Sequence, residues 1–127
     1  MEFPPVPAVL LSPARAICRA LPEASEMDTD VGVEFKVRRR IFAYVFAIAD
    51  PQGKQFTMLS CRADPEEREA LLAGGHPYFA PRHREDRLGV IIDDQSDWEE
   101  LAELITTSYL IVAPAKLAAL VETPPEP

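Results

Sequence analysis

The chain has 127 residues, 47% of them apolar, and a formal net charge of −8. This size and composition suit a single globular domain with a hydrophobic core and argue against a disordered chain. The acidic charge argues against strong non-specific attraction to nucleic acid or anionic lipid, although a local basic surface is compatible with it. Two cysteines, Cys18 and Cys61, form no CxxC pair, and both are expected to be buried free thiols.

The ends of the chain are rich in proline, and the segment between them holds no internal repeat and no linker. We therefore expect one domain over residues 1–127, with its core over about residues 8–121. The first residues, MEFPPVPAVLL, lack the basic and apolar regions of a signal peptide. No apolar run reaches the roughly 18 residues that span a bilayer, so we expect a cytoplasmic protein without membrane contact.

The first part of the chain predicts a helix and then two strands. Ser12 and Pro13 are typical of a helix N-terminus, and Pro22 is expected to end this helix. The segment EASEMDTD is too polar for a buried strand and fits a short edge strand. Residues 33–37 alternate between apolar and charged side chains, which indicates a strand with one solvated face.

A pair of longer strands follows. Arg39 and Arg40 are expected to form the tight turn into residues 41–49, which are apolar on both faces and therefore central in the sheet. Residues 50–53 have aspartate, proline and glycine at the positions that a type I turn favours. Residues 55–61 return as the next strand, and such short connections predict an antiparallel meander.

The next segment predicts a second helix and another strand. Asp64 and Pro65 are typical of a helix start, and residues 74–75, both glycine, of its end. After a loop, residues 88–92 form an apolar strand.

Residues 96–99 match a capping box and predict the start of a long helix. One apolar stripe follows at helical spacing: Trp98, Leu101, Ala102, Ile105, Tyr109 and Val112. Pro114 then separates a short last helix over residues 115–121. The order helix, three or four strands, helix, one or two strands and two C-terminal helices predicts an α+β two-layer sandwich with an antiparallel sheet.

Tests for catalytic or cofactor motifs give little support to an enzyme. The chain contains neither GxGxxG nor GxxxxGK[ST], and the spacing of His76 and His83 matches no common zinc pattern. Cys61 with either histidine is the one candidate for nucleophilic chemistry, and no serine lies in a nucleophile elbow. We expect no catalytic residue, no metal and no cofactor. A small-molecule binder or enzyme that uses a pocket near His76 and His83 is kept as an alternative.

Two basic segments, KVRRR and RHREDR, are candidates for contact with nucleic acid. The candidate residues are Lys36, Arg38, Arg39, Arg40, Arg82, Arg84 and Arg87. Against this interpretation, residues 93–103 are acidic, and a charged turn is often simply solvated. The alternative is a protein-interaction adaptor that docks a partner through its acidic helix or an exposed sheet edge. The sequence predicts no oligomeric state.

Five segments in fixed order resemble the MmcQ/YjbR-like family of small bacterial proteins. They are LPEASE, FKVRRRIFAYV, LSCRADPEEREALL, HPYFAPRHREDRLGVIID and DWEELAELITTSYLIVAPAKLAAL. The resemblance implies a YjbR-like α+β fold similar to that of type III secretion chaperones, which also suggests the adaptor alternative. It further implies a double-wing DNA-binding arrangement, described for some members, and no assigned enzymatic activity. In that arrangement residues 36–40 belong to one hairpin and residues 82–87 to another.

Overall fold

The computed structural model describes residues 3–82 and 84–121. Its elements follow in the order α1 (Ala8–Arg19), β1 (Ser25–Asp28), β2 (Gly32–Val37), β3 (Arg40–Ala49), β4 (Gln55–Arg62), α2 (Pro65–Ala73), β5 (Tyr78–Phe79), β6 (Arg87–Ile92), α3 (Trp98–Val112) and α4 (Ala115–Ala118). The predicted α+β class and the predicted order of elements are confirmed.

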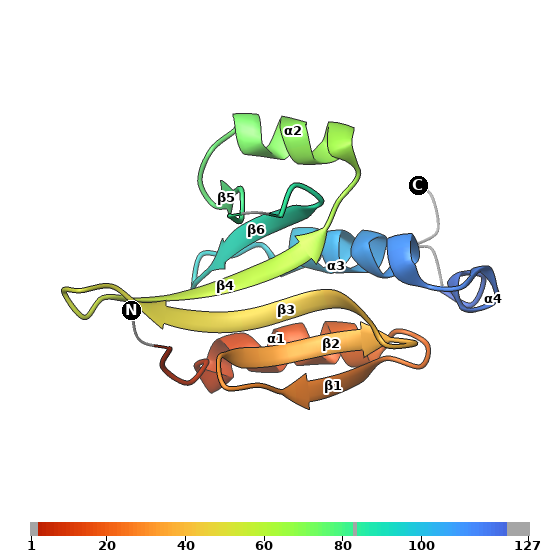
Figure 1. Cartoon of the computed structure of the whole chain (residues 1–127), viewed down its shortest axis with the longest axis horizontal. Coiled ribbons are helices and arrows are strands. Elements are labelled where there is room, and N and C mark those ends of the chain that lie inside the picture. The colour runs from red at the N-terminus through yellow and green to blue at the C-terminus, as the bar shows by residue number, and fades with distance from the viewer. Residues whose placement is uncertain (1–2, 83, 122–127) are drawn as a thin grey trace.

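The strands form one six-stranded sheet in the order β1-β2-β3-β4-β6-β5, and every neighbouring pair is antiparallel. The predicted meander is therefore confirmed, with β1 as the short edge strand. In Figure 1, α1 and α3 lie behind the sheet and α2 lies beyond its β5–β6 edge, while the side facing the viewer carries no helix of the described residues. Residues 3–82 and 84–121 thus form two layers, and no helix among them covers the second face of the sheet.

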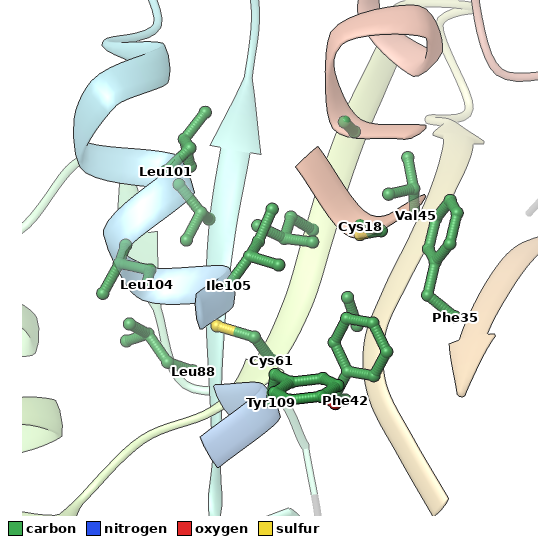
Figure 2. Packing of buried hydrophobic residues seen from close by; sticks show 14 of the residues in the cluster. Cys18, Phe35, Phe42, Val45, Cys61, Leu88, Leu101, Leu104, Ile105 and Tyr109 are labelled. Carbon is green, nitrogen blue, oxygen red and sulfur yellow. The ribbon is translucent and has the colours of Figure 1, made fainter. Parts of the chain in front are cut away.

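The core lies between the sheet and the helices α1 and α3, and Figure 2 shows its centre. Phe42 and Tyr109 meet there edge-to-face, with ring centroids 5.3 Å apart and planes at 86°. The Tyr109 hydroxyl donates a hydrogen bond of 2.7 Å to the Pro22 carbonyl, so this large buried side chain leaves no polar atom unpaired. Cys18 and Cys61 are buried free thiols, as predicted.

The predicted start of the first helix is wrong, because Ser12 and Pro13 lie inside α1. Its N-cap residue is Pro7, whose carbonyl accepts hydrogen bonds from the backbone N–H groups of Leu10 and Leu11 at 3.0 and 2.9 Å. Leu10 and Leu11 pack against the core, and this burial stabilises a first turn that helix-start signals alone do not reveal.

The predicted turn after β2 is wrong by one residue. Val37 pairs with Arg40, so the two-residue loop consists of Arg38 and Arg39, with φ angles of 49° and 71°. Both angles are positive, as in the type I′ turns whose twist matches that of antiparallel hairpins. Burial of the Val37 side chain in the core keeps this residue in the strand.

The ends of the last two helices also differ from the prediction. The N-cap of α3 is Asp97, whose carboxylate accepts hydrogen bonds from the N–H groups of Glu99 and Glu100 at 3.1 and 3.3 Å. Ser96, the predicted cap, instead accepts a hydrogen bond from the Asp93 N–H through its hydroxyl. Helix α4 ends at Ala118, earlier than the predicted residue 121. Within the described residues, no helix has the length and apolar character to cross a bilayer.

Candidate nucleic-acid interface

The sheet face that carries no helix has a mixed surface of apolar, aromatic and charged side chains, which we call the open face. Along β2, β4 and β3 from Ala43 onward, buried residues alternate with partly exposed ones, so the two sets lie on opposite sides of the sheet. The register of β6 with β4 places Arg87 and Ile91 on the exposed side. The open face consists of Met27, Glu34, Lys36, Tyr44, Phe46, Ile48, Phe56, Met58, Ser60, Arg62, Arg87 and Ile91.

Arg62 and Arg87 lie directly opposite each other on β4 and β6, at one end of the open face. Their side chains are only 20% and 13% exposed, and both approach the Asp86 carboxylate, at 3.4 Å from Arg62 Nη1 and 3.7 Å from Arg87 Nε. Arg62 Nε also donates to the Ile41 carbonyl at 3.3 Å. Among the described residues, Arg87 Nε is buried without a hydrogen-bond partner. Two guanidinium groups thus share one carboxylate.

Further arginines join this pair from the β2–β3 hairpin and from the loop before β6. Burial is the main factor that lowers the pKa of Arg62. Positive charges of neighbouring side chains lower this pKa further: Arg87, Arg40 and Arg84. In Figure 1 the β2–β3 turn, the end of β4 and the start of β6 lie at the same side of the sheet. We call Arg40, Arg62, Arg84 and Arg87 the arginine cluster.

The other predicted basic residues have different surroundings. Lys36 lies 3.4 Å from the Glu34 carboxylate on the open face, and Arg38 makes two 3.0 Å hydrogen bonds to Glu23. Arg39 is exposed in the hairpin turn and Arg82 in the loop before β6. The structure therefore brings together Arg40, Arg84 and Arg87 of the predicted set and places Lys36 and Arg38 in ion pairs with acids.

Sequence reasoning missed Arg62 and Arg68. Arg68 on α2 donates a 2.7 Å hydrogen bond from Nε to the Arg87 carbonyl, so it fixes the start of β6 beside the cluster. Each of these arginines is isolated among non-basic neighbours and does not stand out as a charged run. The available signal was the alternation along β4, which places Arg62 on the solvated face with Met58 and Ser60.

Acidic side chains gather in the other layer of the molecule. A hollow between α2 and α3, with a volume of about 350 Å³, is lined by Glu67, Asp97, Glu99, Glu100 and Glu103 together with Leu71 and Leu104. Five acidic side chains thus line one hollow beside the helices, and none of them belongs to the open face. The net charge of −8 therefore does not describe the charge of the open face.

A second cavity, of about 420 Å³, lies where the loop before β5 meets the start of α3. Its walls combine Pro77, Val90 and Leu101 with His76, Tyr78, Asp93, Asp97 and Glu100. The Tyr78 hydroxyl donates a hydrogen bond to the Glu100 carboxylate. Burial and this hydrogen bond raise the pKa of Tyr78.

His76 and Cys61 do not meet at this cavity. His76 lines it, whereas Cys61 is buried in the core and is absent from its walls. Burial, with a smaller contribution from Glu67, raises the pKa of Cys61 to about 12, which keeps the thiol protonated at neutral pH. His83 lies outside the described residues. In residues 3–82 and 84–121, no three ligand-type side chains gather as a metal site requires.

Comparison with known proteins places this fold in a family. The family model described as YjbR matches residues 19–111. Among solved structures, the Deinococcus radiodurans protein DR2400, described with the family-model domain DUF419, has 26% sequence identity and a TM-score of 0.67. That match covers 84% of this chain and 80% of the other. No curated protein gives a significant match.

Proposed function

The chain belongs to the YjbR family. We propose, from the arginine cluster described above, that it is a non-enzymatic protein that binds DNA. The DNA phosphates would lie against the arginine cluster at one end of the open face. The proposal keeps Arg40, Arg84 and Arg87 from the sequence prediction and adds Arg62.

The observation that carries this proposal is the pair of Arg62 and Arg87, which lie opposite each other on β4 and β6 and share the Asp86 carboxylate. The exposed Arg40 and Arg84 add positive charge near this pair. Like charges that are brought together and partly buried are unfavourable unless an anion joins them. Asp86 supplies one negative charge to this group, and Arg87 Nε is a buried donor without a partner among the described residues. A phosphate group would supply both the charge and the acceptor oxygens, in the geometry that guanidinium groups prefer.

The proposal is tested by the anisotropy of a fluorescently labelled duplex at low salt. Arg40 and Arg84 are the side chains to change, because both are exposed and their replacement by glutamine removes charge without opening the core. We expect the double variant Arg40→Gln, Arg84→Gln to bind at least about ten-fold more weakly than the wild type, since each lost phosphate contact weakens binding of any sequence.

A matched control removes the same charge elsewhere. The variant Arg19→Gln, Lys116→Gln alters exposed side chains of α1 and α4 and should stay within about two-fold of the wild type. An equal loss in both variants would show that only net charge matters. A wild-type protein that binds neither the duplex nor its separated strands at low salt would refute the proposal.

The cavity beside His76 favours a second candidate function, the binding of a small molecule. Its apolar walls and its carboxylates suit a small organic cation, with the cationic group near Glu100 and the hydrocarbon part against Val90 and Leu101. Asp93 and Glu100 each accept one hydrogen bond within the protein and Asp97 accepts two, and these bonds orient the carboxylates.

Calorimetric titration with spermidine as the probe tests this second candidate. We expect binding by the wild type and at least about a ten-fold loss in Glu100→Gln, because a carboxylate–ammonium contact is lost. Glu103→Gln is the control, because it removes the same charge from a residue that lines the hollow between α2 and α3 but not the cavity beside His76. Equal affinities in the two variants would count against the cavity beside His76 as the site.

A further inference from the structure

We infer that the open face binds single-stranded nucleic acid, with unpaired bases stacked on Tyr44 and Phe46 next to the arginine cluster. This inference rests on the proposed function, because the same arginines would hold the phosphates. It goes further in naming the class of nucleic acid and a second set of contacts.

The strand register arranges the open face in rows that run across the sheet. Arg62 and Arg87 form one row, and Tyr44 and Ser60 form the next, because Tyr44 pairs with Ser60 and Ser60 lies two positions before Arg62 on β4. Two residues along a strand span about 6.6 Å, so the Tyr44 row lies immediately beside the arginine row. Phe46 belongs to the third row, again two residues further along β3.

Tyr44 and Phe46 form a continuous aromatic surface. Their ring centroids are 5.2 Å apart and their planes are inclined by 30°, and both side chains are partly exposed. The Tyr44 hydroxyl lies 3.2 Å from the Thr29 hydroxyl, which holds this ring in place. A pre-oriented, partly exposed pair of rings is the kind of surface on which successive bases stack.

A third ring extends this surface towards β5. Gly89 lies next to Ser60 in the Tyr44 row, and Phe79 covers it so closely that a Cβ atom at Gly89 would lie 2.4 Å from Phe79 Cζ. The rings of Tyr44 and Phe79 therefore lie on either side of Ser60. Because the serine side chain is small, it does not fill the space between the two rings.

The aromatic rings and the arginine cluster together indicate which ligand fits the open face. Paired bases in a duplex have their faces covered by their neighbours, so aromatic rings can stack only on bases that are unpaired. An apolar protein surface would match the rings but would add no anion to the arginine cluster beyond the Asp86 carboxylate. Single-stranded nucleic acid supplies both an exposed base and a phosphate within one repeating unit.

The test compares a labelled single strand with the duplex of the same sequence, in low salt, for the wild type and for Tyr44→Leu, Phe46→Leu. Leucine keeps an apolar side chain and removes the rings. We expect the double variant to bind the single strand at least about ten-fold more weakly, the size of effect that loss of base stacking produces. Its affinity for the duplex should stay within about two-fold of the wild type.

Two further variants separate this inference from the proposed function. Trp98→Leu removes a ring from the helical layer and should leave single-strand affinity unchanged, with thermal unfolding measured for all variants to confirm the fold. Arg40→Gln, Arg84→Gln should weaken binding of both strand types. If this arginine variant loses affinity while the tyrosine–phenylalanine variant does not, the inference is overturned and the proposed function stands. If the wild type binds neither nucleic acid, both fall.

Discussion

Arg38 and Arg39 hold a backbone conformation that favours glycine or asparagine. Their φ angles of 49° and 71° lie in the left-handed region, where a side chain costs roughly 1–2 kcal/mol per residue. Arg38 has a partner there, since its guanidinium group makes two hydrogen bonds to Glu23. Arg39 is exposed, and its side chain offers no comparable compensation among the described contacts. Arg39 therefore adopts a left-handed backbone conformation that its residue type disfavours, at a position beside the proposed interface.

The strain at Arg39 is measurable by comparing two substitutions. Arg39→Gly should be more stable than Arg39→Ala by about 1 kcal/mol, because both remove the charge and only glycine adopts positive φ without strain. Urea denaturation of the two variants gives the difference. If Arg39 contacts phosphate, both variants should weaken DNA binding by the same factor. Equal free energies of unfolding for the two variants would show that the turn relaxes when the arginine is removed.

The buried thiol of Cys61 is the second feature at this scale. Because burial raises the pKa of Cys61 to about 12 from the ordinary value of 9.0, the folded protein holds the neutral thiol. Reagents that react with the thiolate should therefore modify Cys61 only after unfolding. Cys18→Ala leaves Cys61 as the single thiol, so its reaction with an aromatic disulfide reagent can be followed directly. Rapid reaction of the native protein at pH 8 would contradict the burial that the structure gives this residue.

The same shift fixes the direction of a pH dependence. The unfolded chain loses the Cys61 proton near pH 9, whereas the folded chain keeps it until about pH 12, so above pH 9 the unfolded state binds fewer protons. The contribution of Cys61 to stability is complete below pH 9 and is lost as the pH rises towards 12. Cys61→Ala should flatten this part of the stability curve.

At the scale of elements, Ser108 joins α3 to two strands beneath the arginine cluster. Its buried hydroxyl donates to the Phe42 carbonyl and accepts a 2.8 Å hydrogen bond from the Arg62 N–H. The strand register shifts at this point, since Phe35 pairs with Ala43 whereas Lys36 pairs with Ile41. Phe42 is the extra residue of this bulge, and its carbonyl is satisfied by the helix instead of by β2.

Removal of the Ser108 hydroxyl should therefore lower the stability of the fold more than the loss of one atom usually does. Ser108→Ala leaves the Phe42 carbonyl and the Arg62 N–H buried without that partner, and we expect a loss of about 1–3 kcal/mol in the free energy of unfolding. Thr107→Ala, one position earlier on the same helix and partly exposed, should stay within about 0.5 kcal/mol. Equal losses in the two variants, measured by urea denaturation, would refute the bridging role.

The predicted and observed structures differ mainly at the ends of helices and strands. Strand alternation and apolar stripes predicted the order of elements correctly, because side-chain burial follows directly from these periods. The start of α1 and the turn after β2 were predicted wrongly because both depend on packing, of Leu10 and Leu11 in one case and of Val37 in the other. Local signals such as Ser12–Pro13 do not contain that information.

The candidate site was predictable only in part for a related reason. Runs of arginine are visible in a sequence, whereas the cluster depends on which strand ends meet in space. Arg62 joins Arg87 through the pairing of β4 with β6, a register between segments that lie far apart in the chain. Conversely, Lys36 and Arg38 looked equivalent to the other basic residues until the structure placed Glu34 and Glu23 beside them.

At the scale of the whole molecule, the net charge of −8 is distributed unevenly between the two layers. The hollow between α2 and α3 is acidic, whereas one end of the open face carries the arginine cluster. Such separation would orient an approaching polyanion, which is repelled by the helical layer and attracted by one end of the sheet. It would also make binding sensitive to ionic strength, because the long-range repulsion and the local attraction are both screened.

The salt dependence of binding measures how many arginines contact phosphate. We consider a plot of the logarithm of the affinity against the logarithm of the salt concentration. If four phosphates of a single strand are neutralised, its slope should be about −2.8, at about −0.7 per phosphate. Arg62 and Arg87 share Asp86, so the measured slope should be somewhat shallower. Arg84→Gln should reduce its magnitude by about 0.7, the contribution of one phosphate, whereas Arg19→Gln on α1 should leave it unchanged. A slope that both substitutions change equally would mean that the molecule acts through its net charge. A change confined to Arg84→Gln would place the phosphates at the arginine cluster, even though the protein as a whole is an anion.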